Sequence, residues 1–332
     1  MSDMQKPFVN KAAEPETKNV LRFSRVNALW LFLIAAAGLV ASGFLSRALA
    51  DFLPKQPQLN ELCTNLIYYL PFLVLPVYLS IRAKPEAAAS MRPEPINVWS
   101  MIYIGVLAVL CVFMVSDMSL IWCIPLQKLG FDVFKNQVSI AANPEALVLS
   151  VFTAAAIPGV CEELVFRGVV LSGFEDEGSS RAVRMSALLF ALLHGSITGF
   201  PGQYVLGVVM AMMVISSNSI YAGMVFHTVY NAAVMILEFL QRDLPAEVAY
   251  PSDIVTAVGG WAGVLLLAVE VVLILWMLKF SLNVFHMRGH LKGVRIVPDK
   301  KRKFQWDEKI LLIAALIIVI VLFVSDGLYM LQ

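Results

Sequence analysis

The sequence predicts an all-α protein, a polytopic bundle of about eight to nine transmembrane helices with a buried polar cavity. Of its 332 residues, 59% are hydrophobic and 15% are charged, whereas a soluble domain has about 25% charged residues. The apolar residues form blocks of about 17–25, the length that spans a bilayer as a helix. Some of these blocks nevertheless contain Glu, His or Asn, and such residues need partners or a water-filled cavity inside a membrane.

Nine apolar segments are the candidate spans, and the first is expected to stay uncleaved as a transmembrane helix. The second contains Pro71 and Pro76, which predict a kink. The mixed stretch 117–137 is expected to lie at the membrane interface. The nine segments are 26–45, 62–81, 98–115, 146–171, 183–197, 204–215, 220–240, 254–278 and 310–324.

These segments divide the chain into four parts. A polar tail (1–25) precedes the N-terminal helices and the interfacial segment (26–145). A central core (146–240) holds most of the buried polar residues. The remaining part (241–332) consists of C-terminal helices joined by a basic loop (279–309).

The distribution of Lys and Arg predicts the orientation of the chain in the membrane. The basic residues concentrate in the tail, in 82–92, in 181–184 and in 279–309. The positive-inside rule therefore places the N-terminus in the cytoplasm and the C-terminus outside. We expect an integral protein of a bacterial-type plasma membrane, whose loop 279–309 contacts anionic lipid. No feature indicates nucleic-acid binding.

Several site types have no signature in this sequence. There is no HExxH motif and no Gly-rich phosphate loop. The cysteines lack CxxC spacing and lie in or beside apolar segments, which is typical of buried free thiols rather than of a metal or redox site. They are Cys63, Cys111, Cys123 and Cys161.

The stretch CEELVFRG places three ionisable residues within an apolar span. Glu163 and Arg167 are four residues apart, so they share a helix face and are expected to pair. Glu162 is rotated by about 100° from Glu163, which leaves its carboxylate available for chemistry. Pro158 and Gly159, just upstream, are expected to bend the helix near this site.

Two other spans contribute polar residues at a similar depth. One carries His194, and another carries His227 and Asn231 on one face. Counted from the cytoplasmic helix ends, Glu162 lies about 14 Å into the membrane, His194 about 16 Å and His227 about 10 Å. A single buried site requires such a common depth.

Three motifs on successive helices together resemble a known family. They are EExxxR at 162–167, FxxxH at 190–194 and HxxxN at 227–231. In this order they resemble the CAAX protease and bacteriocin-processing family, also called CPBP or Abi proteins, which includes the CAAX prenyl endopeptidases. The resemblance covers about 146–240 and implies an intramembrane endopeptidase.

The resemblance also implies roles for individual residues. Glu162 would be the general base that activates a water molecule, and His194 would position that water. His227 and Asn231 would stabilise the oxyanion of the tetrahedral intermediate. Cleavage would occur near the cytoplasmic side of the membrane, with water entering from the cytoplasm.

The remaining motif residues and the cofactor question also follow from the resemblance. Glu163 and Arg167 would support the site. Glutamate catalysis without a cofactor is favoured. Because members have also been described as metalloproteases, a zinc site of Glu162, His194 and His227 is the alternative.

Other functions fit the same residues. Buried Glu, His and Asn can join helices by hydrogen bonds, which would suit a non-catalytic scaffold or a bacteriocin-immunity or regulatory protein. Buried acids and histidines also mark transporters, although paired broken helices in matching halves are not evident here. For a protease, the substrate is a peptide or protein, with or without a lipid: a prenylated protein, a pheromone or bacteriocin precursor, or a remnant signal peptide.

Overall fold

The computed structural model describes residues 23–331 apart from 50–51, 53–54, 56, 83–84, 136–140, 142, 246–247, 249, 292–297 and 299–301. Most of the predicted tail 1–25 lies outside this range. The described residues form helices and an isolated antiparallel bridge between Pro93 and Ser219. The all-α prediction is therefore confirmed.

The helices follow one another through the chain with short connections. Their bounds are α1 Arg25–Ala48, α2 Pro57–Arg82, α3 Pro85–Ala89, α4 Val98–Lys128, α5 Pro144–Val151, π-helix η1 Phe152–Ala156, α6 Ile157–Glu163, π-helix η2 Leu164–Val170, α7 Leu171–Phe174, 3₁₀-helix η3 Glu175–Glu177, α8 Ser179–Leu193, α9 Phe200–Ser217, α10 Ile220–Gln241, α12 Ile254–Ala257, α13 Gly260–Leu291 and α14 Trp306–Leu331.

Eight helical segments in the described part of the chain are long and apolar enough to cross a membrane. The continuous run from Pro144 to Glu177 counts as one of them. The other predicted span, α8, has only 15 residues. The predicted bundle of eight to nine spans is confirmed by this count.

Side chains at the first residues define where several helices begin. Ser24 caps α1 in a reciprocal capping box with Asn27. Asn97 accepts a hydrogen bond from the backbone N–H of Ser100 at the start of α4. Asn143 does the same for Ala146, and Pro144 fills the first position of α5, where a missing N–H costs nothing.

Three boundaries differ from those that the sequence predicted. The stretch 117–128, expected at the interface, continues α4 as helix. Residues 279–291 of the expected basic loop extend α13. The helix with the EExxxR motif does not break at residue 172 but continues to Glu177. Membrane-spanning helices project beyond their apolar blocks because the backbone stays hydrogen-bonded in water too, so hydropathy understates their length.

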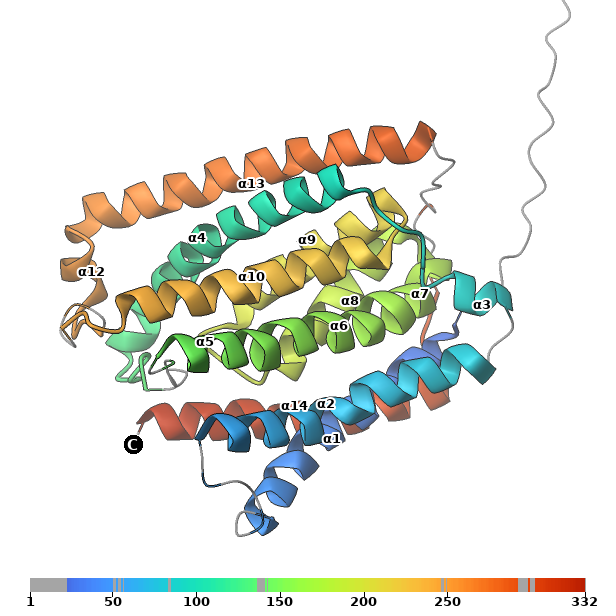
Figure 1. Cartoon of the computed structure of the whole chain (residues 1–332), viewed down its shortest axis with the longest axis horizontal. Coiled ribbons are helices and arrows are strands. Elements are labelled where there is room, and N and C mark those ends of the chain that lie inside the picture. The colour runs from blue at the N-terminus through green and yellow to red at the C-terminus, as the bar shows by residue number, and fades with distance from the viewer. Residues whose placement is uncertain are drawn as a thin grey trace, which may run out of the picture.

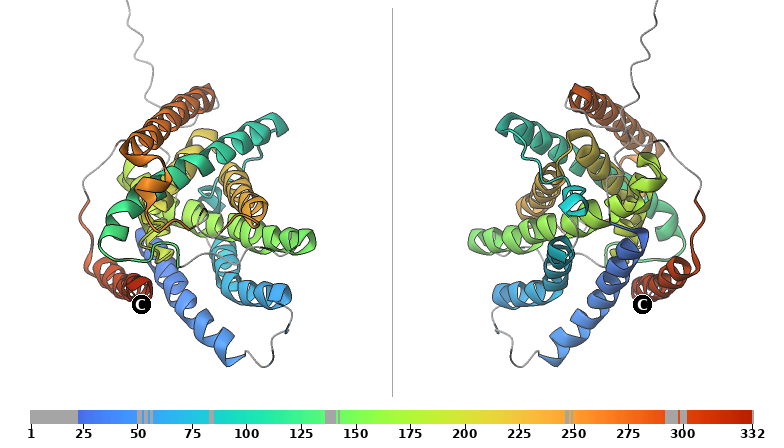
Figure 2. Two further views of the ribbon diagram at one scale, coloured as in Figure 1. Left: turned by 90° about the vertical axis from the view of Figure 1, so that its left-hand side faces the viewer. Right: turned by 90° about the vertical axis from the view of Figure 1, so that its right-hand side faces the viewer.

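The helix from α5 to α7 lies in the middle of the bundle. Figure 1 shows it between α10 on one side and α2 on the other. Seen along the bundle in Figure 2, it again separates α1 and α2 from α4, α10 and α13. Helix α6 packs against both α10 and α2, so a side chain on α6 can meet partners from either layer.

One end of the bundle is joined by buried ion pairs. We call it the basic end; there α1 and α14 begin and α2 and α13 end. Arg25 pairs with Glu177 and, at 2.8 Å, with Glu308, and these side chains are at most 3% exposed. Arg92 pairs with Glu175 at 2.5 Å. The backbone N–H of Ile220 donates to the carbonyl oxygen of Arg92, which fixes the start of α10 at the same end.

Candidate active site

The two glutamates of the EExxxR motif lie on α6, between two π-helical segments. The sequence predicted a bend at Pro158 and Gly159. The helix continues through these residues and is widened on both sides of them. The N–H of Ile157 bonds to the carbonyl of Phe152, and the N–H of Leu171 bonds to the carbonyl of Phe166. Such π segments insert a residue into the helical register and often accompany functional sites.

Two glycines allow α6 and α10 to approach closely. A Cβ atom on Gly159 would lie 2.2 Å from the hydroxyl oxygen of Thr228 and 3.0 Å from its backbone nitrogen. A Cβ atom on Gly223 would lie 2.5 Å from Oε2 of Glu163. Larger residues at these positions would push the glutamates away from the histidine on α10.

Glu163 is fully buried and is held by charged partners. Its Oε1 accepts hydrogen bonds from Nη1 of Arg167 at 2.6 Å and from Nδ1 of His227 at 3.1 Å. This confirms the predicted pairing with Arg167. The guanidinium also donates to the carbonyl of Gly207 and lies 4.5 Å from the centre of the Phe190 ring. Glu163 and Arg167 therefore fix the position of His227.

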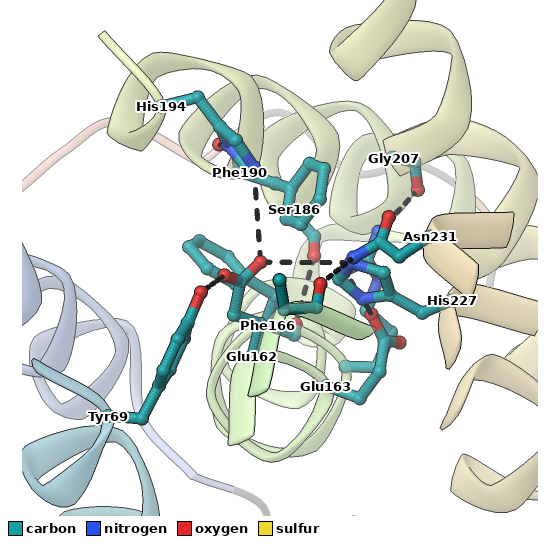
Figure 3. Close-up of polar contacts among 12 residues, drawn as sticks. Tyr69, Glu162, Glu163, Phe166, Ser186, Phe190, His194, Gly207, His227 and Asn231 are labelled. Carbon is teal, nitrogen blue, oxygen red and sulfur yellow. Dashed lines mark hydrogen bonds and ion pairs between the residues drawn. The ribbon is translucent and has the colours of Figure 1, made fainter. Parts of the chain in front are cut away.

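Glu162 is also buried, but its partners differ. Oε1 accepts a hydrogen bond from the hydroxyl of Tyr69 on α2, at 3.0 Å. Oε2 has no protein hydrogen-bond partner and lies 4.0 Å from Nε2 of His194 and 4.0 Å from Nε2 of His227. Figure 3 shows this carboxylate between Tyr69 and the two imidazoles. The side chains from three predicted spans thus meet at one point.

His194 ends α8 and is partly exposed. Gly195 follows it with a φ of +60°, the left-handed conformation in which glycine often terminates a helix. Nδ1 of His194 lies 2.8 Å from the carbonyl oxygen of Phe190. Since a carbonyl only accepts, Nδ1 carries the proton, and the neutral ring presents the lone pair of Nε2 towards Glu162.

Asn231 lies one turn after His227 on α10. Its Nδ2 donates to the carbonyl of Ala154, in π-helix η1, at 3.3 Å. One of its two amide hydrogens is used in this bond, and the other remains available. Asn231 forms no hydrogen bond with Glu162, but the two residues line the same cavity.

A cavity of about 730 Å³ connects these groups. Glu162, His194, His227 and Asn231 all line it, together with Tyr69. Its size suits a peptide segment with several side chains, because ligand cavities of about 300–1,000 Å³ hold drug-sized molecules. The carboxylate of Glu162 therefore faces accessible space, whereas Glu163 and Arg167 lie behind it.

The predicted zinc alternative requires converging ligands. Within the described ranges, no group of three His, Cys, Asp or Glu side chains is arranged to hold a metal ion. Nε2 of each imidazole lies 4.0 Å from Oε2 of Glu162, and His227 turns its other nitrogen towards Glu163. In this arrangement the three predicted ligands do not form such a group.

Two residues near the site were not among those predicted. Tyr69 bonds to the carboxylate of Glu162, and Phe190 contacts the rings of both His194 and His227. Phe190 belongs to the FxxxH motif, so its position was available from the sequence. Tyr69 lies on a span without a motif, and a tyrosine in an apolar helix gave no signal of its role.

One of the comparisons with known proteins gives a match. Residues 144–233 match the family model described as type II CAAX prenyl endopeptidase Rce1-like. The match includes every residue of the three motifs. Comparisons with curated proteins and with solved structures give no match. Over these residues the chain is similar to the CAAX-type endopeptidase family that its motifs resemble.

Proposed function

We propose that the chain is an intramembrane endopeptidase in which Glu162 and His194 activate a water molecule that attacks a peptide bond. The observation that carries this proposal is the Oε2 atom of Glu162. It is buried without a hydrogen-bond partner, faces the cavity and lies 4.0 Å from Nε2 of His194.

The spacing of these two atoms suits one bridging water. Both atoms are hydrogen-bond acceptors when Glu162 is ionised and His194 is neutral. A water about 2.8 Å from each acceptor would subtend an angle close to that between its own O–H bonds. Its two hydrogens would then point at Oε2 and Nε2, and its lone pairs at the cavity.

The reaction follows from this arrangement. Glu162 takes a proton from the water as the oxygen attacks the carbonyl carbon of the substrate, and a tetrahedral oxyanion forms. The protonated Glu162 then gives that proton to the leaving nitrogen, and the C–N bond breaks to release an amine and a carboxylic acid. General acid–base catalysis of this kind typically contributes about 10²–10⁴ in rate.

We assign stabilisation of the oxyanion to His227 and Asn231. Because Nδ1 of His227 donates to the Glu163 carboxylate, Nε2 can donate only when the ring is doubly protonated. Asn231 supplies its second amide hydrogen, so one charged and one neutral donor would face the oxyanion.

The alternative functions make different demands on Glu162. In a scaffold whose polar residues only join helices, each buried carboxylate oxygen should have a partner, since an unpaired one costs stability. Oε2 of Glu163 also lacks a partner but does not line the cavity, so it is the position of Oε2 of Glu162 beside the cavity that favours catalysis over that role. A transporter would require coupled movement of an ion and a substrate, which flux measurements across vesicles would detect.

The direct test is cleavage of a quenched fluorescent peptide library by the purified protein in detergent. Peptides with and without a farnesyl-cysteine would be compared, because the family includes enzymes with prenylated substrates. We expect wild-type cleavage, loss in Glu162→Ala and His194→Ala, and no effect of a chelator. Loss with chelator and recovery with zinc would instead establish the metal mechanism. The scaffold would be favoured by two results together: wild type and Glu162→Ala are equally inactive on all peptides, and both support growth equally in the native cell.

We also propose that anionic lipid binds at the basic end. A cavity of about 470 Å³ there is lined by basic residues above an apolar wall of α14. Each basic residue near an anionic membrane surface contributes about 1 kcal/mol. Thermal shifts with added anionic phospholipid should be smaller in Arg302→Gln/Lys303→Gln than in wild type. The basic residues are Arg181, Arg302, Lys303 and Lys309.

A further inference from the structure

The active-site cavity reaches towards the end of the bundle opposite the basic end. We call this opposite end the cavity end. Val133 and Phe134, which follow α4, line it there, as do Thr198 and Gly199, which precede α9. Glu238, in the last turn of α10, completes this wall. The basic end contributes no comparable lining, because the start of α10 at Ile220 is buried against Arg92.

The charge distribution assigns these two ends to different sides of the membrane. Most of the 25 Lys and Arg residues belong to segments that begin or end at the basic end. By the positive-inside rule, that end is cytoplasmic. The cavity end carries few basic residues: Arg47, Lys55, Lys128, Lys135 and Arg242.

We propose that this cavity takes a basic peptide segment from the extracytoplasmic face of the membrane, and that Glu238 binds its positive charge. This proposal rests on the proposed endopeptidase function and specifies its substrate. It replaces our expectation that substrate and water enter from the cytoplasm. The depths counted along the helices did not show which end of the bundle is open.

The charges in the cavity indicate what kind of peptide fits. None of the described residues that line it is Lys or Arg, while Glu162 and Glu238 are both acidic. A free C-terminal carboxylate would therefore find no guanidinium or ammonium partner in it. A Lys or Arg side chain of the substrate would find Glu238, which forms no salt bridge with any residue that the structure describes.

Glu238 lies within a predicted membrane span, where an unpaired acid is costly. Glu238 is in the last turn of α10, close to the end of the span, and acids within spans usually face a water-filled path and serve function. Glu238 is half-buried and shares one face of α10 with His227 and Asn231, at intervals of four and seven residues. Its position on the cavity wall explains why an acid is present in this span, which packing alone does not explain.

The helix geometry sets where the basic residue should lie in the substrate. Asn231 and Glu238 are separated by about 10 Å along α10, and His227 and Glu238 by about 16 Å. An extended peptide advances about 3.3 Å per residue. The basic side chain should therefore lie roughly three to five residues from the scissile bond.

The direction of entry can be tested without any substrate. Asp243→Cys places a thiol at the cavity end, and Glu94→Cys places one at the basic end; both parent side chains are exposed. In intact cells, a membrane-impermeant maleimide should label Asp243→Cys above the wild-type background and leave Glu94→Cys unlabelled until the membrane is opened. The reverse pattern would overturn extracytoplasmic entry, while cleavage in detergent would still support the endopeptidase function.

The role of Glu238 can be tested by charge. Two peptides are compared in detergent: one with Lys four residues from the scissile bond, and its analogue with Gln at that position. The ratio of their kcat/KM values (Lys peptide over Gln peptide) should fall about 10- to 100-fold in Glu238→Gln, because removing one member of a partly buried charge pair is costly. Glu238→Lys should invert the preference towards a Glu peptide. Asp243→Asn, which removes an exposed acid outside the cavity, is the matched control and should keep the wild-type ratio. An unchanged ratio in Glu238→Gln would overturn the assignment, and the use of a ratio removes any effect of partial unfolding.

Discussion

The chain buries carboxylates in two places, and their surroundings differ. At the basic end, Glu177 lies between Arg25 and Arg181, and Glu308 also faces Arg25. In the active site, no described guanidinium lies within salt-bridge distance of Glu162. It has one tyrosine hydroxyl and two imidazoles at 4.0 Å.

The difference teaches how to separate structural from reactive charge in a membrane protein. A carboxylate with a fixed cation close by is neutralised and unavailable for proton transfer. A carboxylate beside groups that can themselves gain or lose protons, with space for water, is available. Glu163, which is bound by Arg167 although adjacent to Glu162, falls into the first group.

The largest expected effect separates Glu162 from such structural acids. Glu162→Gln keeps the size and the bond from Tyr69 but removes the base, so kcat should fall by about 10²–10⁴ with little change in Tm. The measurement is peptide cleavage in detergent beside a thermal unfolding curve. Glu145→Gln, an exposed position on the same continuous helix, is the matched control and should behave as wild type. A large fall in Tm in Glu162→Gln would place Glu162 with the structural acids.

Breaking the basic end should give the opposite pattern. Arg25→Ala leaves Glu177 and Glu308 buried without their shared partner, which should cost about 3–5 kcal/mol in the free energy of unfolding. Activity per folded molecule should stay near that of wild type. Denaturation in detergent measures the first quantity and active-fraction kinetics the second. Arg242→Ala, which breaks an exposed pair with Asp243, should cost at most about 1 kcal/mol.

Much of the active site could be predicted because its chemistry is local in sequence. The four-residue spacings of Glu163 with Arg167 and of His227 with Asn231 follow from the helical period, and the pair of Glu163 and Arg167 is present as expected. Their similar depth in the membrane met a condition that a single buried site requires, although depth alone did not show that the side chains touch. The order of the motifs gave the family.

Other features depended on tertiary contacts and left no sequence pattern. Tyr69 reaches Glu162 only because α2 packs on α6. The bond between His227 and Glu163 leaves a neutral His227 without a donor towards the cavity, and spacing alone does not determine which nitrogen faces which acid. The open end of the cavity depends on how loops pack, and hydropathy carries no information about that.

Asn231→Ala tests the oxyanion donors. Loss of one such donor typically lowers kcat by about 10²–10³, and KM should change little because the interaction forms only in the transition state. Asn231 also bonds to Ala154, so Asn231→Asp serves as a second variant that keeps the side-chain size but replaces the amide donor with an acid. Activity within threefold of wild type in both variants would assign oxyanion stabilisation to His227 alone.

The smallest expected effect concerns Tyr69, which the structure adds to the site. Tyr69→Phe removes the hydrogen bond to Oε1 of Glu162, and we expect kcat to fall about tenfold at unchanged KM, since a bond to a charged group contributes about 1.5–3 kcal/mol. Tyr68→Phe, at the neighbouring position in the same aromatic cluster, is the matched control and should have no such effect. If Tyr69 acts by positioning Glu162, Tyr69→Phe should cause almost no further loss in a Glu162→Gln background, because two residues that act through one group are not additive. Equal losses in the wild-type and Glu162→Gln backgrounds would show that Tyr69 acts on substrate binding or on packing instead. The histidines, and not Tyr69, would then orient Oε2 of Glu162.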